Sequence, residues 1–290
     1  MKKYLLLIFT ALLLGNVCAE QGPENNSYWS KAKDWWQERR EYMAAAFWTS
    51  SLGDLDVKEE IDREIRAILK EIGLENVNEI RIKRLSKLIQ YNGVGEKNAI
   101  ATGLIGLPRY IFVNEEWWVT LTPEKKRFLI GHEGMHLKCN HGDKKMGLSI
   151  ACVTLASFAL LKAELDSFRA PGLFDEDVAL PHFYRHLCVG ALVAGMVVIP
   201  WFSKRCEYEA DAEAVKALGC YEGAYAFFDE MCEYKEALYA ELSQRPEFVE
   251  ARRRAEEQVL THPTHAQRIA QIQALEQKLK NEQLALLNNE

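Results

Sequence analysis

The stretch IGHEGMHLKCNHG, residues 130–142, contains two histidines and a glutamate at a spacing that suits metal chemistry. On an α-helix, residues i and i+4 lie one turn apart on the same face, so His132 and His136 can hold one ion together. Glu133 can reach the coordination position that the histidines leave open, where it can take the proton of an attacking water. The pattern H-E-x-x-H therefore predicts a hydrolytic metal site, and a helix with incidental histidines is the alternative.

A hydrolytic zinc ion takes three protein ligands, so the chain must supply a third. The acidic stretch SKRCEYEADAEAVKALG, residues 203–219, predicts a second helix on which Glu207 and Asp211 are again four residues apart. Glu207 can supply the third ligand oxygen, and Asp211 can accept the N–H of a zinc-bound histidine and fix its tautomer. Alone, this pair would indicate a charged helix surface; together with H-E-x-x-H it indicates a metal site.

A further polar element, THPTHAQRI, lies near the C-terminus at residues 261–269. His262, His265 and Arg268 can contribute a donor to the developing oxyanion of a tetrahedral intermediate. A loop capped into a surface helix is the alternative interpretation, and either histidine could also occupy the open metal position. His141 receives no ligand role, because three protein ligands suffice.

The elements that must position these residues follow from periodicity and turn residues. An amphipathic helix is expected over residues 57–72, ending at Gly73, followed by short strands at 78–84, 98–103 and 109–113. Thr122 is the expected N-cap, with Pro123 at the first position, of a helix that precedes the one carrying His132. Residues 207–240 read as helical, with interruptions at Gly219 and Gly223.

Two apolar runs, residues 146–161 and 187–202, are nearly free of charge. Each is slightly shorter than the roughly 20 residues that span a bilayer. A membrane hairpin is the first interpretation, and a pair of buried core helices is the alternative.

The N-terminal residues 1–19 combine two lysines, an apolar core and a small-residue cleavage pattern, which predicts a secretory signal peptide or an N-terminal anchor. An aromatic-rich helical linker is expected over residues 20–56. The bulk of the chain is therefore expected to be exported and associated with a membrane. Seven cysteines are present, and six remain after the predicted signal, a number that permits disulfides in an exported protein. Their irregular spacing assigns no particular pairing, so disulfide pairing stays open.

The overall composition excludes several classes of protein. Of the 290 residues, 48% are hydrophobic and 27% are charged, which fits neither a disordered chain nor a transporter with many spans. The net charge of −6 and the lack of a basic stripe argue against a nucleic-acid partner.

Four motifs occur together in a recognisable order. They are Asn98-Ala99 with Gly103 and Ile111-Phe112-Val113, then H-E-G-M-H, then Glu207 with Asp211, and finally His262-Pro263 with Arg268. Over residues 57–275 this order resembles the HtpX-type and CaaX-prenyl-protease-type zinc peptidases, metallopeptidase family 48, a gluzincin family.

The resemblance implies an α+β, mainly helical domain with a small edge-exposed β-sheet. It also implies an inserted apolar hairpin at 146–202. Beyond the region of resemblance, the charged composition predicts a helical tail at 276–290. One zinc ion per chain would be bound by His132, His136 and Glu207. Glu133 would be the general base, and Asp211 would orient a histidine ligand.

For the substrate, the resemblance implies that an edge strand pairs with an extended polypeptide by backbone hydrogen bonds. The residues of this strand that would bind the substrate are Asn98, Ala99, Ile100 and Ala101. His262 and Arg268 would contact the substrate or the transition state. The implied activity is endopeptidase cleavage of membrane or envelope proteins in quality control. The predicted export signal, rather than the resemblance, gives the expectation that the site lies on the extracytoplasmic side. A zinc-binding envelope assembly factor without proteolytic activity is the alternative. The oligomeric state stays open.

Overall fold

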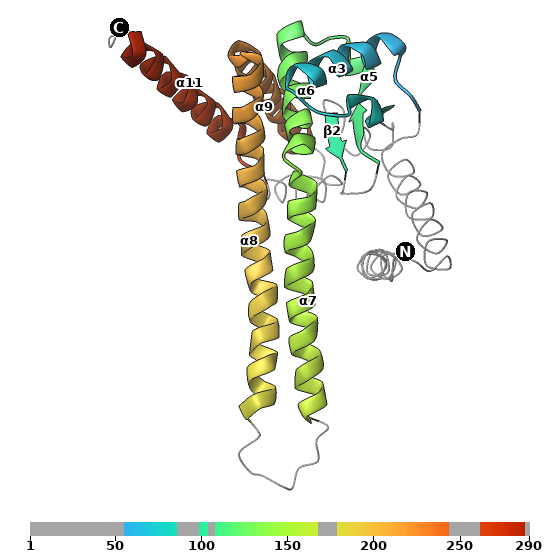
Figure 1. Ribbon diagram of the computed structural model, residues 1–290, viewed down its shortest axis with the longest axis vertical. Helices are drawn as coiled ribbons and strands as arrows, with labels where there is room; N and C mark the ends of the chain where they lie inside the picture. Colours follow the sequence, from blue (N-terminus) through green and yellow to red (C-terminus); the bar gives the residue numbers. More distant parts are fainter. Residues whose placement is uncertain (1–54, 86–98, 104–107, 168–178, 244–261, 288–290) are drawn as a thin grey trace, which may run out of the picture.

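The computed structural model describes residues 55–85, 99–103, 108–167, 179–243 and 262–287. Figure 1 shows a head of helices and a small sheet, from which two long helices project side by side. The predicted signal peptide or anchor, most of the aromatic-rich linker and Asn98 lie outside the described residues. The mainly helical α+β fold that was predicted is confirmed.

Helix α6, Pro123–Lys138, is the central element of the head. The hydroxyl of Thr122 accepts a hydrogen bond from the Lys125 N–H, and Pro123 occupies the first turn, as the sequence predicts. The prediction that this helix precedes the one carrying His132 was wrong, because a single helix contains both. Gly131 does not break it. A Cβ at Gly131 would lie 2.6 Å from Leu218 Cδ1, so the glycine allows close packing of α6 on the neighbouring helix.

The head has three described strands, β1 (Arg81–Arg84), β2 (Ala99–Thr102) and β3 (Tyr110–Val113), in the order β1-β3-β2. Strand β3 is parallel to β1 and antiparallel to β2, and all four of its residues are buried. The first strand starts three residues later than predicted, because Val77–Glu79 forms the 3-10 turn η1. Among the described strands, β2 therefore lies at an edge of the sheet.

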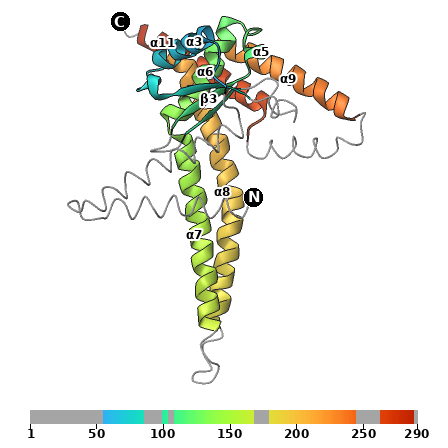
Figure 2. The ribbon, with the colours of Figure 1, turned by 90° about the vertical axis from the view of Figure 1, so that its right-hand side faces the viewer.

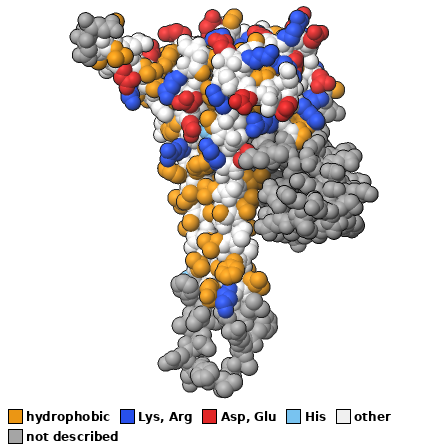
Figure 3. All heavy atoms as spheres, in the orientation of Figure 1, with side chains coloured by type: hydrophobic (Ala, Val, Ile, Leu, Met, Phe, Trp, Pro, Cys, Tyr) orange, Lys and Arg blue, Asp and Glu red, His pale blue; other side chains and the backbone are white. Residues whose placement is uncertain are grey.

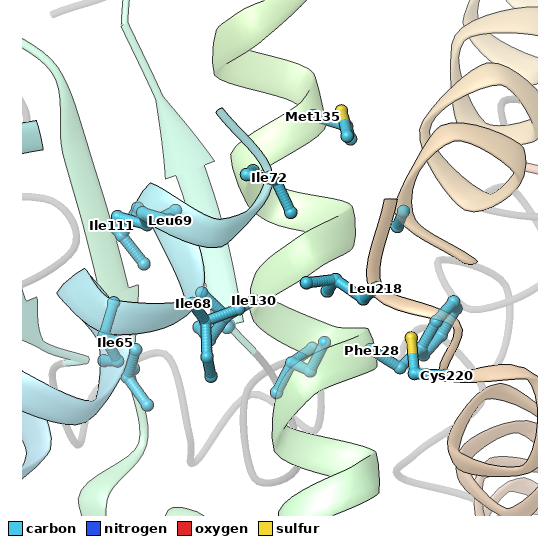
Figure 4. Packing of buried hydrophobic residues seen from close by; sticks show 14 of the residues in the cluster. Ile65, Ile68, Leu69, Ile72, Ile111, Phe128, Ile130, Met135, Leu218 and Cys220 are labelled. Atoms are coloured by element: carbon cyan, nitrogen blue, oxygen red, sulfur yellow. The ribbon is translucent and has the colours of Figure 1, made fainter. Parts of the chain in front are cut away.

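The hydrophobic core packs around both sides of α6. Helix α3 (Glu59–Glu71) buries one apolar face against it, and the short helix α5 (Glu115–Trp118) follows β3. Figure 4 shows Ile68 and Leu69 of α3 on one side of α6 and Leu218 on the other. The metal motif is thus carried by a helix that is held between two layers.

Helices α7 (His141–Ser167) and α8 (Ala179–Leu218) form the projecting pair in Figures 1 and 2. The expectation that a new acidic helix begins after the second apolar run was wrong. Helix α8 continues from the apolar run through Pro200 to Glu207 and beyond. The change from apolar to charged residues lies along one helix axis and requires no break in the backbone.

The outward faces of this pair are apolar, which is the reverse of a soluble helix pair. Phe158, Met196 and Trp201 are 60%, 75% and 59% exposed. Small side chains fill the contact between the two helices, at Ala156, Ala159, Ala163 and Ala191. Figure 3 shows hydrophobic side chains over the projecting helix pair, below a head with many charged side chains. The alternative of buried core helices is therefore wrong for the described part of the pair.

Two further helices of the described part of the chain belong to the head. Helix α8 ends at Leu218, and Gly219, with φ of +64°, allows the turn into α9 (Tyr221–Ser243). The sequence also predicted a helix interruption at Gly223, but this residue lies within the first turn of α9. Helix α11 (His265–Leu287) packs on α8 and α9 and runs continuously through residue 276.

The Gly223→Ala substitution is expected to lower the free energy of unfolding by about 1–3 kcal/mol. A Cβ at this position would overlap the backbone carbonyl of Glu124 in the first turn of α6. Gly147→Ala is the matched control, since a Cβ there meets nothing within 4 Å. Thermal unfolding of both variants measures the difference, and an unchanged Tm for Gly223→Ala would contradict this packing.

Candidate metal centre

Helices α6 and α8 bring three metal-ligating side chains to one point. His132 Nε2 and His136 Nε2 are 3.1 Å apart. Glu207 of α8 places one oxygen 3.4 Å from His132 Nε2 and the other 3.5 Å from His136 Nε2. Two imidazole nitrogens and one carboxylate oxygen are the donor set of a hydrolytic zinc site with one coordination position open. The residues therefore fit a zinc ion.

Asp211 lies one turn after Glu207 and fixes the orientation of His132. Its Oδ1 is 2.8 Å from His132 Nδ1, and the carboxylate is almost fully buried. Since the other ring nitrogen faces Glu207, the hydrogen-bond network assigns the proton of neutral His132 to Nδ1. Nε2 is then left with the lone pair that a metal ion requires.

Arg268 of α11 lies behind this pair. Its Nε and Nη2 donate to the two oxygens of Asp211, each at 2.6 Å, and its side chain is 11% exposed. The family resemblance implied that Arg268 contacts the substrate or the transition state. The structure places its guanidinium on Asp211, with Nη1 3.8 Å from Glu207 Oε2. These contacts support a role for Arg268 in positioning Asp211.

The two histidines have different electrostatic surroundings. Burial lowers the pKa of both rings, because a charged imidazolium is poorly solvated there. At His132 the Asp211 carboxylate outweighs burial and raises the pKa to about 9. At His136 burial prevails and lowers the pKa to about 4, so this ring is neutral at pH 7.

Glu133 lies between the histidines and the edge strand. Its Oε2 accepts a hydrogen bond from the Ala101 N–H at 2.6 Å. Burial raises the pKa of the Glu133 carboxyl, against the opposing effects of His132 and the Ala101 N–H. A carboxylate with a raised pKa is a stronger proton acceptor, which suits a general base.

Strand β2 presents backbone groups to the same site. Because Ala101 N–H donates to Glu133, it points away from β3, and the alternation of an antiparallel ladder gives Ala99 the same outward orientation. Ile100 lies between them. A pocket of about 270 Å³ lies beside this strand, lined by residues that include Ala101, Gly103, His136 and Lys145.

The C-terminal histidines take different places. His262 Nε2 is 3.6 Å from Glu207 Oε1, and the side chain is 51% exposed, so it lies at the solvent side of the site. His265 does not reach the site. Its Nδ1 is 3.8 Å from Cys232 Sγ and its ring packs on Phe228, which corrects the suggestion that it could occupy the open metal position.

His141 is the residue that the sequence interpretation left without a role. Its Nδ1 lies 2.9 Å from His136 Nδ1, and the residue is 1% exposed. Asn140, with φ of +52°, turns the chain between α6 and α7 and brings His141 back against His136. The signal in the sequence was a histidine five residues after the second ligand, just beyond an asparagine that tolerates this conformation.

Comparisons with known proteins agree with this donor set. A family model described as Peptidase family M48 matches residues 58–276, which covers most of the chain and all the residues of the site. It does not distinguish the HtpX-type branch within the family. No curated protein and no solved structure matches the chain. The chain belongs to peptidase family M48.

Proposed function

We propose that this protein is a zinc endopeptidase that cleaves polypeptides at a membrane surface. Family M48 consists of zinc-dependent peptidases, and peptide-bond hydrolysis follows from membership. The observation that carries the proposal is the convergence of His132, His136 and Glu207 on one point, with Glu133 beside it. One zinc ion at this point is the proposed catalytic cofactor.

His132, His136 and Glu207 would hold the zinc ion, which would supply Lewis acidity to a water molecule and to the peptide carbonyl. Glu133 accepts the proton of the attacking water and returns it to the leaving amine. Asp211 and Arg268 hold His132 in the required tautomer and orientation. His262, at the exposed side of Glu207, is placed to donate to the developing oxyanion.

The proposed substrate is an extended polypeptide that adds to the edge of β2. The outward N–H of Ala101 is held by Glu133, and a substrate carbonyl that accepts this N–H would free the carboxylate for its role as base. Docking of the substrate on β2 and release of the Glu133 carboxylate from the Ala101 N–H then occur together. This coupling favours cleavage of internal peptide bonds, because the substrate polypeptide must extend along β2 on both sides of the ion.

Ala101→Pro is expected to lower kcat/KM by about five- to tenfold, mainly through KM, because it removes one backbone hydrogen bond worth about 1 kcal/mol. An edge strand tolerates proline where the N–H faces outward. Ile100→Pro is the contrasting control, because the Ile100 N–H faces β3 and its loss should lower Tm. Steady-state kinetics and thermal unfolding separate the two, and an unaltered kcat/KM in Ala101→Pro would reject docking on β2.

We also propose that the α7–α8 hairpin is inserted in a membrane. The export signal predicted at residues 1–19, and not the distribution of charge around the hairpin, is the reason for proposing that the head lies on the extracytoplasmic side. The two helices contain candidate spans, His141–Ala163 and His186–Leu218, that are long and apolar enough to cross a bilayer. Glu207 follows the apolar run by five residues, about 7.5 Å along the helix. Lys144, Lys145, Lys204 and Arg205 flank this end of the runs. These features favour an ion at headgroup level and damaged membrane or envelope proteins as substrates.

Cleavage of casein by the detergent-purified chain tests the activity. Internal cleavage is expected, with loss of activity after chelation and recovery on addition of one equivalent of zinc. A peptide blocked at both ends distinguishes endopeptidase from exopeptidase action. Zinc binding without cleavage of either substrate would favour the assembly factor instead, and cleavage that persists after verified removal of zinc would reject the metal mechanism.

A further inference from the structure

A second group of metal-ligating side chains lies next to His136 and has no part in the mechanism above. Cys139 is the C-cap of α6, His141 begins α7, and Glu209 lies on α8. One ligand atom from each lies within 4.8 Å of the other two. Cys139 is a free thiol. The left-handed conformation of Asn140 brings Cys139 and His141 together across the junction of two helices.

The ring of His141 points an unpaired nitrogen into this group. Its Nδ1 contacts His136, whereas its Nε2 is buried and has no hydrogen-bond partner among the residues that the structure describes. The nearest acceptor of the group, Glu209 Oε2, is 3.6 Å away, which is too far for a hydrogen bond. Buried polar atoms almost always have a partner, so this nitrogen requires an explanation.

We propose that Cys139, His141 and Glu209 bind a second zinc ion, with lower affinity than the catalytic site. Thiolate sulfur, imidazole nitrogen and carboxylate oxygen are the three donor types that zinc takes in proteins. The ion binds His141 through Nε2, which gives this nitrogen its partner. Glu209 is 44% exposed, so an ion can reach the group from solvent.

Binding of the second ion is coupled to the catalytic site through the contact between two rings. When His136 binds zinc through Nε2, its Nδ1 carries the proton and donates to Nδ1 of His141. Neutral His141 then carries its own proton on Nε2, where the second ion binds. That proton moves to Nδ1 and ends the hydrogen bond from His136, while the thiol proton of Cys139 leaves to solvent.

The second ion therefore weakens the support of a catalytic ligand. Loss of the partner that orients a metal-binding histidine typically lowers metal affinity or activity by about 10–100-fold. Because coupling between two sites is reciprocal, the catalytic ion also lowers the affinity for the second ion. The group acts as an inhibitory site that responds to excess zinc.

Stepwise loading of the full chain with Co²⁺ in detergent tests this site. The catalytic site has no sulfur ligand, so a thiolate-to-cobalt charge-transfer absorption reports on the second site alone. The absorption is expected only after the first equivalent, to be lost in Cys139→Ser and to be kept in the matched control Cys152→Ser. Its absence from the wild type, or its persistence in Cys139→Ser, would overturn the proposal.

Activity gives a second reading on the same variants. Excess zinc is expected to lower wild-type kcat/KM by about 10–100-fold, and to leave Cys139→Ser and Glu209→Gln unaffected. The inhibition rests on the proposed peptidase function, but the cobalt absorption does not. A chain with the Cys139-dependent absorption and no cleavage would reject only the proposed function. An active peptidase that binds a single equivalent would reject only the second site.

Discussion

Replacing Glu133 by Gln is expected to lower kcat/KM for casein by about 10²–10⁴-fold, the usual contribution of a general base. Gln keeps the size of the side chain but cannot accept the proton of the attacking water. It can still accept the Ala101 N–H, so the local structure should be retained. Because Glu133 is not one of the three converging ligands, zinc content should remain that of the wild type.

The matched control for this experiment is Glu213→Gln. Glu213 lies on α8, is 44% exposed and pairs with Lys216, three residues along the same helix. The kcat/KM of the Glu213→Gln variant should equal that of the wild type. Metal analysis and steady-state kinetics are needed on both variants. A Glu133→Gln protein that keeps its zinc and its full activity would show that Glu133 is not the general base. If the variant loses its zinc, the loss of activity would be due to the missing metal and would not test the role of the base.

Replacing Arg268 by Met is expected to lower the free energy of unfolding by about 3–5 kcal/mol, because it leaves a buried carboxylate without its main partner. Asp211 would keep only His132, and both of its oxygens now accept from the guanidinium. The same change should weaken zinc binding by about 10–100-fold, since Asp211 is then less able to orient His132. Urea unfolding and competition with a zinc chelator measure the two effects.

Two comparisons show whether this loss comes from the buried pair. Arg63→Met removes a pair with Glu59 in which the side chains are 69% and 86% exposed, so a change of less than about 0.5 kcal/mol is expected. The double variant Asp211→Asn with Arg268→Met removes both charges and should be less destabilised than the sum of the single changes. Additive losses would contradict a direct interaction.

The parts of the site that local spacing defines could be predicted from the sequence. His132 with His136, and Glu207 with Asp211, are four residues apart on helices, so their shared faces follow from helix geometry. The structure brings both pairs together. The N-cap at Thr122 was equally local, since its hydroxyl bonds to the backbone three residues along the chain.

The parts that depend on distant segments could not be predicted. Arg268 is 57 residues from Asp211, and no periodicity indicates that α11 packs where the two side chains meet. The continuity of α8 was missed because Pro200 and the change in composition resemble a boundary in the sequence. The contact between His141 and His136 depends on the conformation of one residue, Asn140.

The continuity of α8 fixes the rotational phase between its two halves. Each residue advances an α-helix by about 100° and 1.5 Å. Any insertion or deletion of one residue between Phe202 and Glu207 would turn Glu207 and Asp211 together away from α6, although both would remain in a perfect helix. The residues of the apolar half can therefore change in type without moving the site. The number of residues between the apolar run and Glu207 can change only by whole helical turns, because any other change would rotate Glu207 and Asp211 away from α6.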